Sequence, residues 1–194
     1  MRVHGDVVIR RREKVGELKD YRDARILLRE DFSELCGYCG KNGKNMHEKF
    51  HIDHFIPVSL SKEHEKDYYN LVWTCPKCNR NKSDKWPTGD ITQPNDGVRG
   101  WIDPATEDFD KHIERNEQGF VVGVTPLGKS MCSLLKLDIR RSDLFWKISQ
   151  LYLQQEELEN LQKERRLSEE ELDFYIESNK LLKQYINEAF EAGE

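Results

Sequence analysis

The sequence predicts an α+β protein, with short strands in its first half and long helices at its end. Two observations support this fold class. Residues 50–57 alternate between apolar and polar side chains as a half-buried strand does, and residues 70–74 form a second strand-like segment just before the second Cys-x-x-Cys pair. From about Asp143 onward, leucine and isoleucine recur at spacings of three, four and seven residues, which is typical of amphipathic helices.

The composition excludes a membrane-embedded protein. Charged residues make up 35% of the 194 residues, and no apolar run approaches the roughly 18 residues that a spanning helix needs. The basic N-terminal segment lacks the apolar stretch of a signal peptide, so a cytoplasmic location is expected. In such a reducing compartment, spaced cysteines bind metal more often than they form disulfides.

The net charge of −5 is distributed unevenly along the chain. Residues 1–90 hold 18 basic and 15 acidic residues, a net of +3, whereas residues 91–194 hold 13 and 21, a net of −8. A surface that binds phosphate groups is therefore expected in the first half. The Arg10–Lys14 run (RRREK) is either such a surface or an exposed strand end.

Local patterns divide the chain into four parts. Residues 1–33 are expected to form a strand (6–13) and an amphipathic helix (20–33). Residues 34–90 hold the cysteines and two strands, followed by a helix with Pro76 in its first turn. Residues 91–140 are expected to continue an irregular connector (88–100) into a short hairpin and helix (119–137).

The last part, residues 141–194, is predicted to be helical throughout. Ser168 and Glu171 have the spacing of a capping box, which marks the start of a second helix. We therefore expect a helical hairpin, or a coiled-coil arm that binds a partner protein.

Four cysteines form the first candidate site. Cys36 and Cys39 are separated by 35 residues from the second pair, Cys75 and Cys78. Each pair brings two thiolates together, and four thiolates complete the tetrahedral coordination of Zn²⁺. Because no coordination position then stays open, such a zinc ion is structural rather than catalytic. The alternatives are four unrelated buried thiols, or one redox pair with two bystanders. Cys132, in an apolar stretch, is expected in the core.

Asp53 and His54 begin a second candidate site. An aspartate is a hard oxygen donor suited to Mg²⁺ or Mn²⁺, and a histidine can act as a general base at neutral pH. Neighbours on a strand point to opposite faces, so the two share a site only if the strand twists or ends there. His51 lies two residues before Asp53 and could line the same face, although a surface role is more common.

Asn79 and Lys82 lie on the helix expected after Pro76. The Asn79 amide oxygen could complete a metal site with Asp53. Lys82 is three residues further on, hence on the same helical face, where it could meet a phosphate oxygen. Together these are the parts for phosphodiester hydrolysis, in which a metal polarises the phosphate and His54 activates water.

The pattern C-x2-C, D-H-x-x-P, N-L, C-x2-C-N-x-x-K over about residues 34–87 resembles the HNH endonucleases, and residues 79–84 resemble the matching helix of CRISPR effector nucleases. The resemblance implies a ββα-metal fold of the cysteine-bearing subset. It also implies roles: His54 as general base, Asp53 as first metal ligand, and Asn70 as the residue that fixes the loop and thereby His54. Asn79 stands where many members have histidine, which favours Mg²⁺ or Mn²⁺ at the catalytic centre.

Residues 101–137 resemble, more loosely, extensions of bacterial HNH proteins encoded beside ATPases in anti-phage systems such as Septu. That resemblance implies a defence nuclease controlled by a partner ATPase, with the acidic helical end as a docking surface. Two other hypotheses about function stay open: a non-catalytic zinc module that binds nucleic acid or protein, and a stand-alone restriction or homing enzyme. DNA is the expected substrate, and RNA is not excluded.

Overall fold

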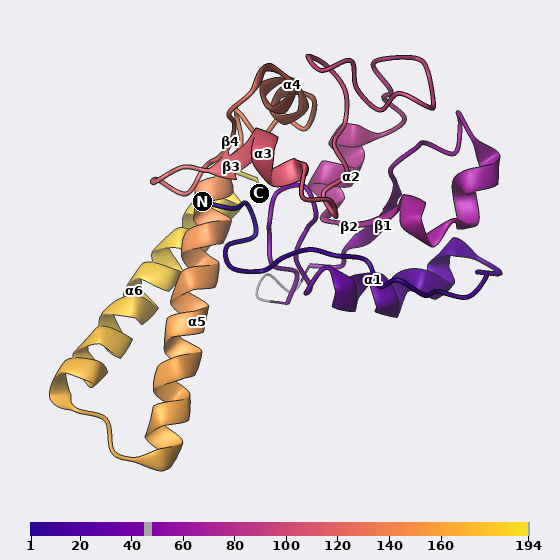
Figure 1. Cartoon of the computed structure of the whole chain (residues 1–194). Helices are drawn as coiled ribbons and strands as arrows, with labels where there is room; N and C mark the ends of the chain where they lie inside the picture. Colours follow the sequence, from indigo (N-terminus) through magenta and orange to yellow (C-terminus); the bar gives the residue numbers. More distant parts are fainter. Residues whose placement is uncertain (45–47, 194) are drawn as a thin grey trace.

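The structure, a computed structural model that describes residues 1–44 and 48–193, has two regions (Figure 1). One holds both Cys-x-x-Cys pairs and the short strands, and the other is a pair of long helices that projects away from it. The main apolar core lies in the first region and spans residues from Val3 to Leu137. A second cluster joins the two long helices through Leu144, Ile148, Leu182 and Ala189.

A strand–strand–helix unit forms the centre of the first region. β1 (His51–His54) pairs antiparallel with β2 (Leu71–Thr74), with Asp53 opposite Val72. α2 (Pro76–Lys82) follows directly, and Pro76 lies in its first turn, where no helical bond needs the missing N–H. The predicted strands and helix are therefore confirmed, with β1 shorter than the segment 50–57.

The N-terminal strand is the clearest wrong prediction. Residues 6–13 run as extended loop without strand pairing, whereas the predicted helix 20–33 forms as a 3-10 turn, η1 (Tyr21–Ala24), and α1 (Arg25–Asp31). Side chains rather than a sheet partner hold the extended segment. Arg11 binds Asp103 at 2.7 and 3.0 Å, and Arg12 binds Asp31 at 2.8 Å.

Between β1 and β2 the polar loop contains two short 3-10 helices, η2 (Lys62–Lys66) and η3 (Tyr68–Asn70). The connector 88–100 has no helix or strand of its own, as predicted. It is closed by an isolated bridge between Asn95 and Gly100.

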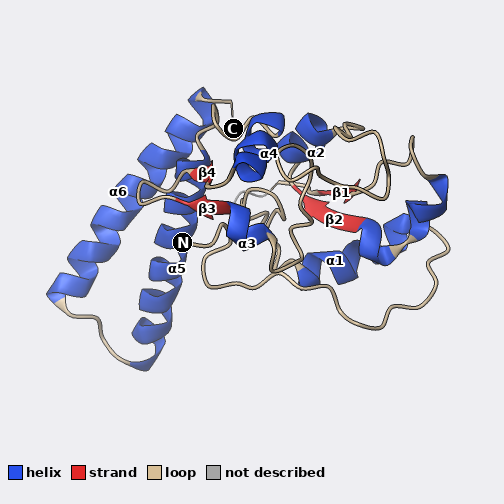
Figure 2. Cartoon of the chain, turned by 45° about the horizontal axis from the view of Figure 1, so that its top comes forward, coloured by secondary structure: helices blue, strands red, loops and turns tan. Residues whose placement is uncertain are grey.

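The extension that follows packs into the main core. α3 (Phe109–His112) leads into β3 (Ile113–Arg115), which pairs antiparallel with β4 (Val121–Gly123), and α4 (Pro126–Leu134) follows. Figure 2 shows this small sheet apart from the β1–β2 sheet. The hairpin and helix expected over 119–137 are confirmed, but the first strand lies earlier. Trp101, Phe109 and Ile113 are buried in the main apolar core, so the extension belongs to the first region.

The chain ends in the predicted helical hairpin of α5 (Ser142–Glu164) and α6 (Glu169–Glu191). Ser168 and Glu171 form the expected capping box, each satisfying a backbone N–H of the other. Lys77 of α2 donates to the carbonyl of Gly193, so the returning helix ends beside the strand–strand–helix unit. Within the described part of the chain, no helix has both the length and the apolarity to cross a membrane.

Candidate active site and four-cysteine site

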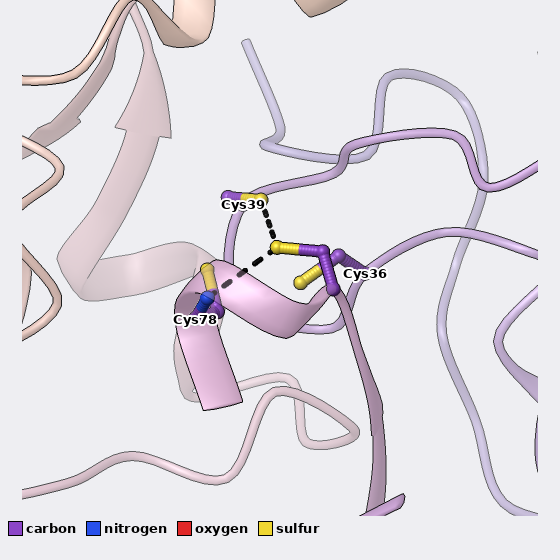
Figure 3. Close-up of side chains that lie close together, drawn as sticks. Cys36, Cys39 and Cys78 are labelled. Atoms are coloured by element: carbon purple, nitrogen blue, oxygen red, sulfur yellow. Dashed lines mark hydrogen bonds between the residues drawn. The ribbon is translucent and has the colours of Figure 1, made fainter. Parts of the chain in front are cut away.

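The four predicted cysteines lie together. Cys36 and Cys39 are on the turn after α1, and Cys75 and Cys78 begin α2, all of them buried. Their Sγ atoms lie within 4.8 Å of one another (Figure 3), and Cys39 Sγ is 3.8 Å from Cys75 Sγ. Sulfur atoms around a tetrahedral zinc with bonds of about 2.3 Å are separated by about 3.8 Å. The cluster therefore has a metal-binding arrangement, and the Cys39–Cys75 separation equals the value expected around zinc.

Local backbone geometry produces this convergence. Gly40 has a φ of 68°, and a Cβ at this position would lie 2.4 Å from the Val3 carbonyl, so the turn requires glycine. On the second pair, Cys75 caps α2, since its Sγ accepts a hydrogen bond from the Cys78 N–H at 3.4 Å. Each Cys-x-x-Cys pair thus turns both of its thiols toward the same centre.

Cys132 is separate from that cluster, as predicted. It lies on α4 and is 4% exposed. Burial raises the pKa of its thiol to about 12, so the thiol stays protonated at neutral pH. Cys132 is therefore a core residue.

Asp53 lies on the face of β1 that α2 covers. The side chain is 6% exposed, and its Oδ2 accepts a hydrogen bond from the Tyr38 hydroxyl at 2.8 Å. Lys82 Nζ is 3.2 Å from Oδ1 and 3.1 Å from Oδ2, and it also donates to the His54 carbonyl at 2.6 Å. Burial raises the pKa of Asp53, which Lys82 and Tyr38 oppose, and burial lowers the pKa of Lys82, which Asp53 opposes.

This pair differs from the sequence expectation. Lys82 is 0% exposed and turns inward to Asp53, so it is not presented to a phosphate. A divalent ion at Asp53 would have to displace the ammonium group. On the same side, Asn79 Nδ2 lies 3.2 Å from Nδ1 of the exposed His51. The oxygen donors of Asp53 and Asn79 suit Mg²⁺ or Mn²⁺ by type, but in this structure they do not form an open cation site.

His54 lies on the other face of β1, as strand alternation requires. Its half-buried ring packs edge-on against Tyr21 with the ring centroids 4.9 Å apart. Nε2 is 3.0 Å from the carbonyl oxygen of Glu65. Because a carbonyl only accepts, Nε2 carries the hydrogen and Nδ1 holds the lone pair that can take a proton. Asp53 and His54 therefore have different neighbours in this structure: Asp53 contacts Tyr38 and Lys82, whereas His54 contacts Tyr21 and Glu65.

Asn70 is buried at the end of η3 and connects both sides of the loop that follows His54. Its Oδ1 accepts from the Ile56 N–H at 2.7 Å. Its Nδ2 donates to the carbonyls of Ile56 and His64, each at 3.1 Å. The Asn70 side chain therefore fixes the backbone two residues after His54. In addition, the Phe55 N–H donates to the backbone carbonyl of Asn70.

The N-terminal basic run is engaged within the protein. Arg10 binds Glu107 at 2.9 Å, and Arg11 and Arg12 bind the aspartates named above. Arg11 and Arg12 are thus held in partly buried ion pairs, whereas the Arg10–Glu107 pair lies at the surface.

Sequence reasoning missed Tyr38 and Tyr21. Tyr38 stands between the first two cysteines, so its proximity to the metal-binding turn was visible, but its bond to Asp53 was not. Tyr21 contacts His54 across 33 residues of sequence, and no motif marks that contact.

Comparison with known protein families identifies the family of the domain that holds this site. Residues 36–85 match the family model described as HNH endonuclease, a range that contains all four cysteines together with β1, β2 and α2. Neither the curated proteins nor the solved structures gave a match. The chain therefore carries a domain of the HNH endonuclease family, which indicates a nuclease with a nucleic-acid substrate. HNH nucleases use divalent metals.

Proposed function

We propose that this protein is an endonuclease that hydrolyses phosphodiester bonds of DNA, with His54 as the general base. The observation that carries the proposal is the orientation of His54 within the family match. The Glu65 carbonyl fixes the Nε2–H tautomer, and Nδ1 is left with its lone pair. Asn70 holds the following loop, and Lys82 holds the His54 carbonyl.

In the proposed reaction, the attacking water gives a proton to His54 Nδ1 while the water oxygen bonds to phosphorus. The bond from phosphorus to the leaving oxygen breaks, and that oxygen takes a proton from solvent. Mg²⁺ or Mn²⁺ is the ion that we expect the enzyme to require, because Asp53 and Asn79 offer hard oxygen donors. Asp53 and Asn79 would hold such an ion once the Lys82 ammonium group has moved from Asp53, and the ion would supply Lewis-acid polarisation of the scissile phosphate. Cys36, Cys39, Cys75 and Cys78 are proposed to hold a structural Zn²⁺, since four thiolates leave no open position for substrate.

Cleavage of supercoiled plasmid by purified protein tests this proposal, with Mg²⁺, Mn²⁺ or EDTA and with His54→Ala beside wild type. We expect metal-dependent cutting that the variant lacks. Parallel reactions with single-stranded DNA and RNA identify the substrate class. A zinc-loaded, folded wild type that cuts none of these substrates, alone or with its partner, would favour the non-catalytic zinc module instead.

We further propose that the α5–α6 hairpin docks a protein partner that controls the nuclease, an ATPase in a defence system. Residues 141–194 hold 13 acidic and 7 basic residues, a net of −6, which disfavours contact with DNA. The hairpin projects from the body (Figure 1), and α6 exposes apolar side chains, including Leu172, Phe174, Ile176, Leu181 and Phe190. A partner with a basic surface and apolar contacts fits this helix.

Substitution of Phe174 and Leu181 by serine tests this docking role. We expect the double variant to keep basal cleavage and to lose control by the ATPase. Unchanged control by the ATPase would contradict the docking role without affecting the nuclease proposal.

A further inference from the structure

Two buried arginines lie beside the four-cysteine site, and both come from outside the HNH match. Arg115 belongs to β3 and is 1% exposed, and Arg140, between α4 and α5, is 4% exposed. Arginine stays charged in proteins, and an uncompensated buried charge is strongly unfavourable. Their position therefore requires negative charge or many acceptors nearby.

Arg140 contacts a metal-binding residue directly. Its Nη1 lies 3.3 Å from Cys78 Sγ, within the range of an N–H donor to sulfur. The guanidinium carbon is also 5.9 Å from the centre of the Phe145 ring at the start of α5. Arg140 thus connects the cysteine site to the long helix.

Arg115 contacts the same site through the backbone. Its Nη2 donates to the Cys39 carbonyl at 2.9 Å and to the Val3 carbonyl at 3.1 Å. Its Nη1 donates to the carbonyls of Gly119 and Ser142. One side chain therefore joins the N-terminus, the first cysteine turn, the β3–β4 turn and the first residue of α5.

The charge of the two arginines matches that of a loaded site. Four thiolates around one Zn²⁺ carry a net charge of −2, and two guanidinium groups carry +2. We propose that Arg115 and Arg140 neutralise a zinc–tetrathiolate centre from its surroundings and thereby couple zinc binding to the packing of residues 113–164 against the HNH domain. Groups that surround a metal in this way typically change its affinity 10- to 100-fold.

The proposal rests on the zinc site proposed above, and measurement of zinc affinity tests it. Competition with a chromophoric chelator would compare wild type, Arg140→Met and Arg140→Lys. The control is Arg80→Met, which removes an exposed charge from α2 two residues after Cys78. We expect a 10- to 100-fold loss for Arg140→Met, a much smaller loss for Arg140→Lys, and a change below about threefold for the control. The thiolate-to-metal absorption of Co²⁺-loaded protein should still report four thiolates.

Thermal unfolding with zinc and with chelator separates this role from simple packing. A packing role lowers Tm equally in both conditions, whereas the proposed role lowers the zinc-dependent gain in Tm. Arg140→Gln, which also removes the charge, provides the same comparison if Arg140→Met does not fold. Zinc binding by wild type with unchanged affinity in the uncharged Arg140 variant would overturn this proposal alone. A wild type that binds no zinc would overturn the proposed zinc site as well.

Discussion

Replacement of Lys82 by methionine should strongly destabilise the protein. Methionine keeps most of the length and packing of the side chain but removes the charge that faces Asp53. Lys82 is 0% exposed and Asp53 is 6% exposed, so the remaining carboxylate stays buried with the Tyr38 hydroxyl as its neighbour. Removal of one partner of a buried ion pair lowers the free energy of unfolding by about 3–5 kcal/mol. For a chain of this size, that corresponds to a fall in Tm of about 6–20 °C.

Urea unfolding at pH 7 measures this loss, with Lys85→Met as the control, because Lys85 is exposed three residues away. We expect the control to change the free energy of unfolding by less than about 0.5 kcal/mol. Adding Asp53→Asn to Lys82→Met should recover part of the loss, because no buried charge then remains. A loss below about 1 kcal/mol in Lys82→Met would refute the buried pair.

The same variant should show a distinctive pH dependence. Burial already raises the pKa of Asp53, and removal of Lys82 takes away the charge that opposes this rise. A raised pKa in the folded state means that folding favours the protonated acid. Stability of Lys82→Met should therefore fall as the pH rises above the ordinary aspartate value of 3.8 toward the raised pKa.

Three further outcomes follow from the described contacts. Burial raises the pKa of Asp31, but hydrogen bonds from Arg12 and Tyr68 outweigh it and lower the pKa. The stability that this carboxylate contributes should be present above pH 3.8 and lost as the pH falls through the lowered value, and acid titration of wild type against Asp31→Asn measures it. Cys75→Ser should lower Tm to about that of chelator-treated wild type rather than reduce activity alone, because zinc-binding free energy is folding free energy, and a Tm equal to that of zinc-loaded wild type would contradict this. Asn70→Ala should cost about 2–4 kcal/mol by leaving buried loop groups unpaired and should slow cleavage, as unfolding and kinetics can show.

The sequence predicted elements whose signals are local. The Cys-x-x-Cys spacing, Pro76 in the first turn of α2 and the Ser168 capping box each depend on residues within a few positions of one another, and all three are confirmed. The strand expected over residues 6–13 failed because a strand needs a partner, and partners are not encoded locally. There, Arg11 and Arg12 bind remote aspartates instead.

In the candidate site, too, features set by neighbouring residues could be predicted, whereas contacts between remote residues could not. The motif predicted one site that contains Asp53 and His54, and in the structure these neighbours contact different residues. The pairing of Lys82 with Asp53 spans 29 positions, and that of Arg140 with Cys78 spans 62. Helical spacing placed Lys82 on the same face of the helix as Asn79. That spacing could not show that the Lys82 side chain is buried.

Catalysis through His54 is tested by the single-turnover cleavage rate of His54→Ala, compared with wild type and with His64→Ala. The control removes a nearby imidazole while keeping the backbone carbonyl that Asn70 uses. Loss of a general base should reduce the rate by about 10²–10⁴-fold in His54→Ala, with unchanged zinc content and Tm. His64→Ala should stay within about threefold of wild type. Equal rates for His54→Ala and wild type would contradict catalysis through His54.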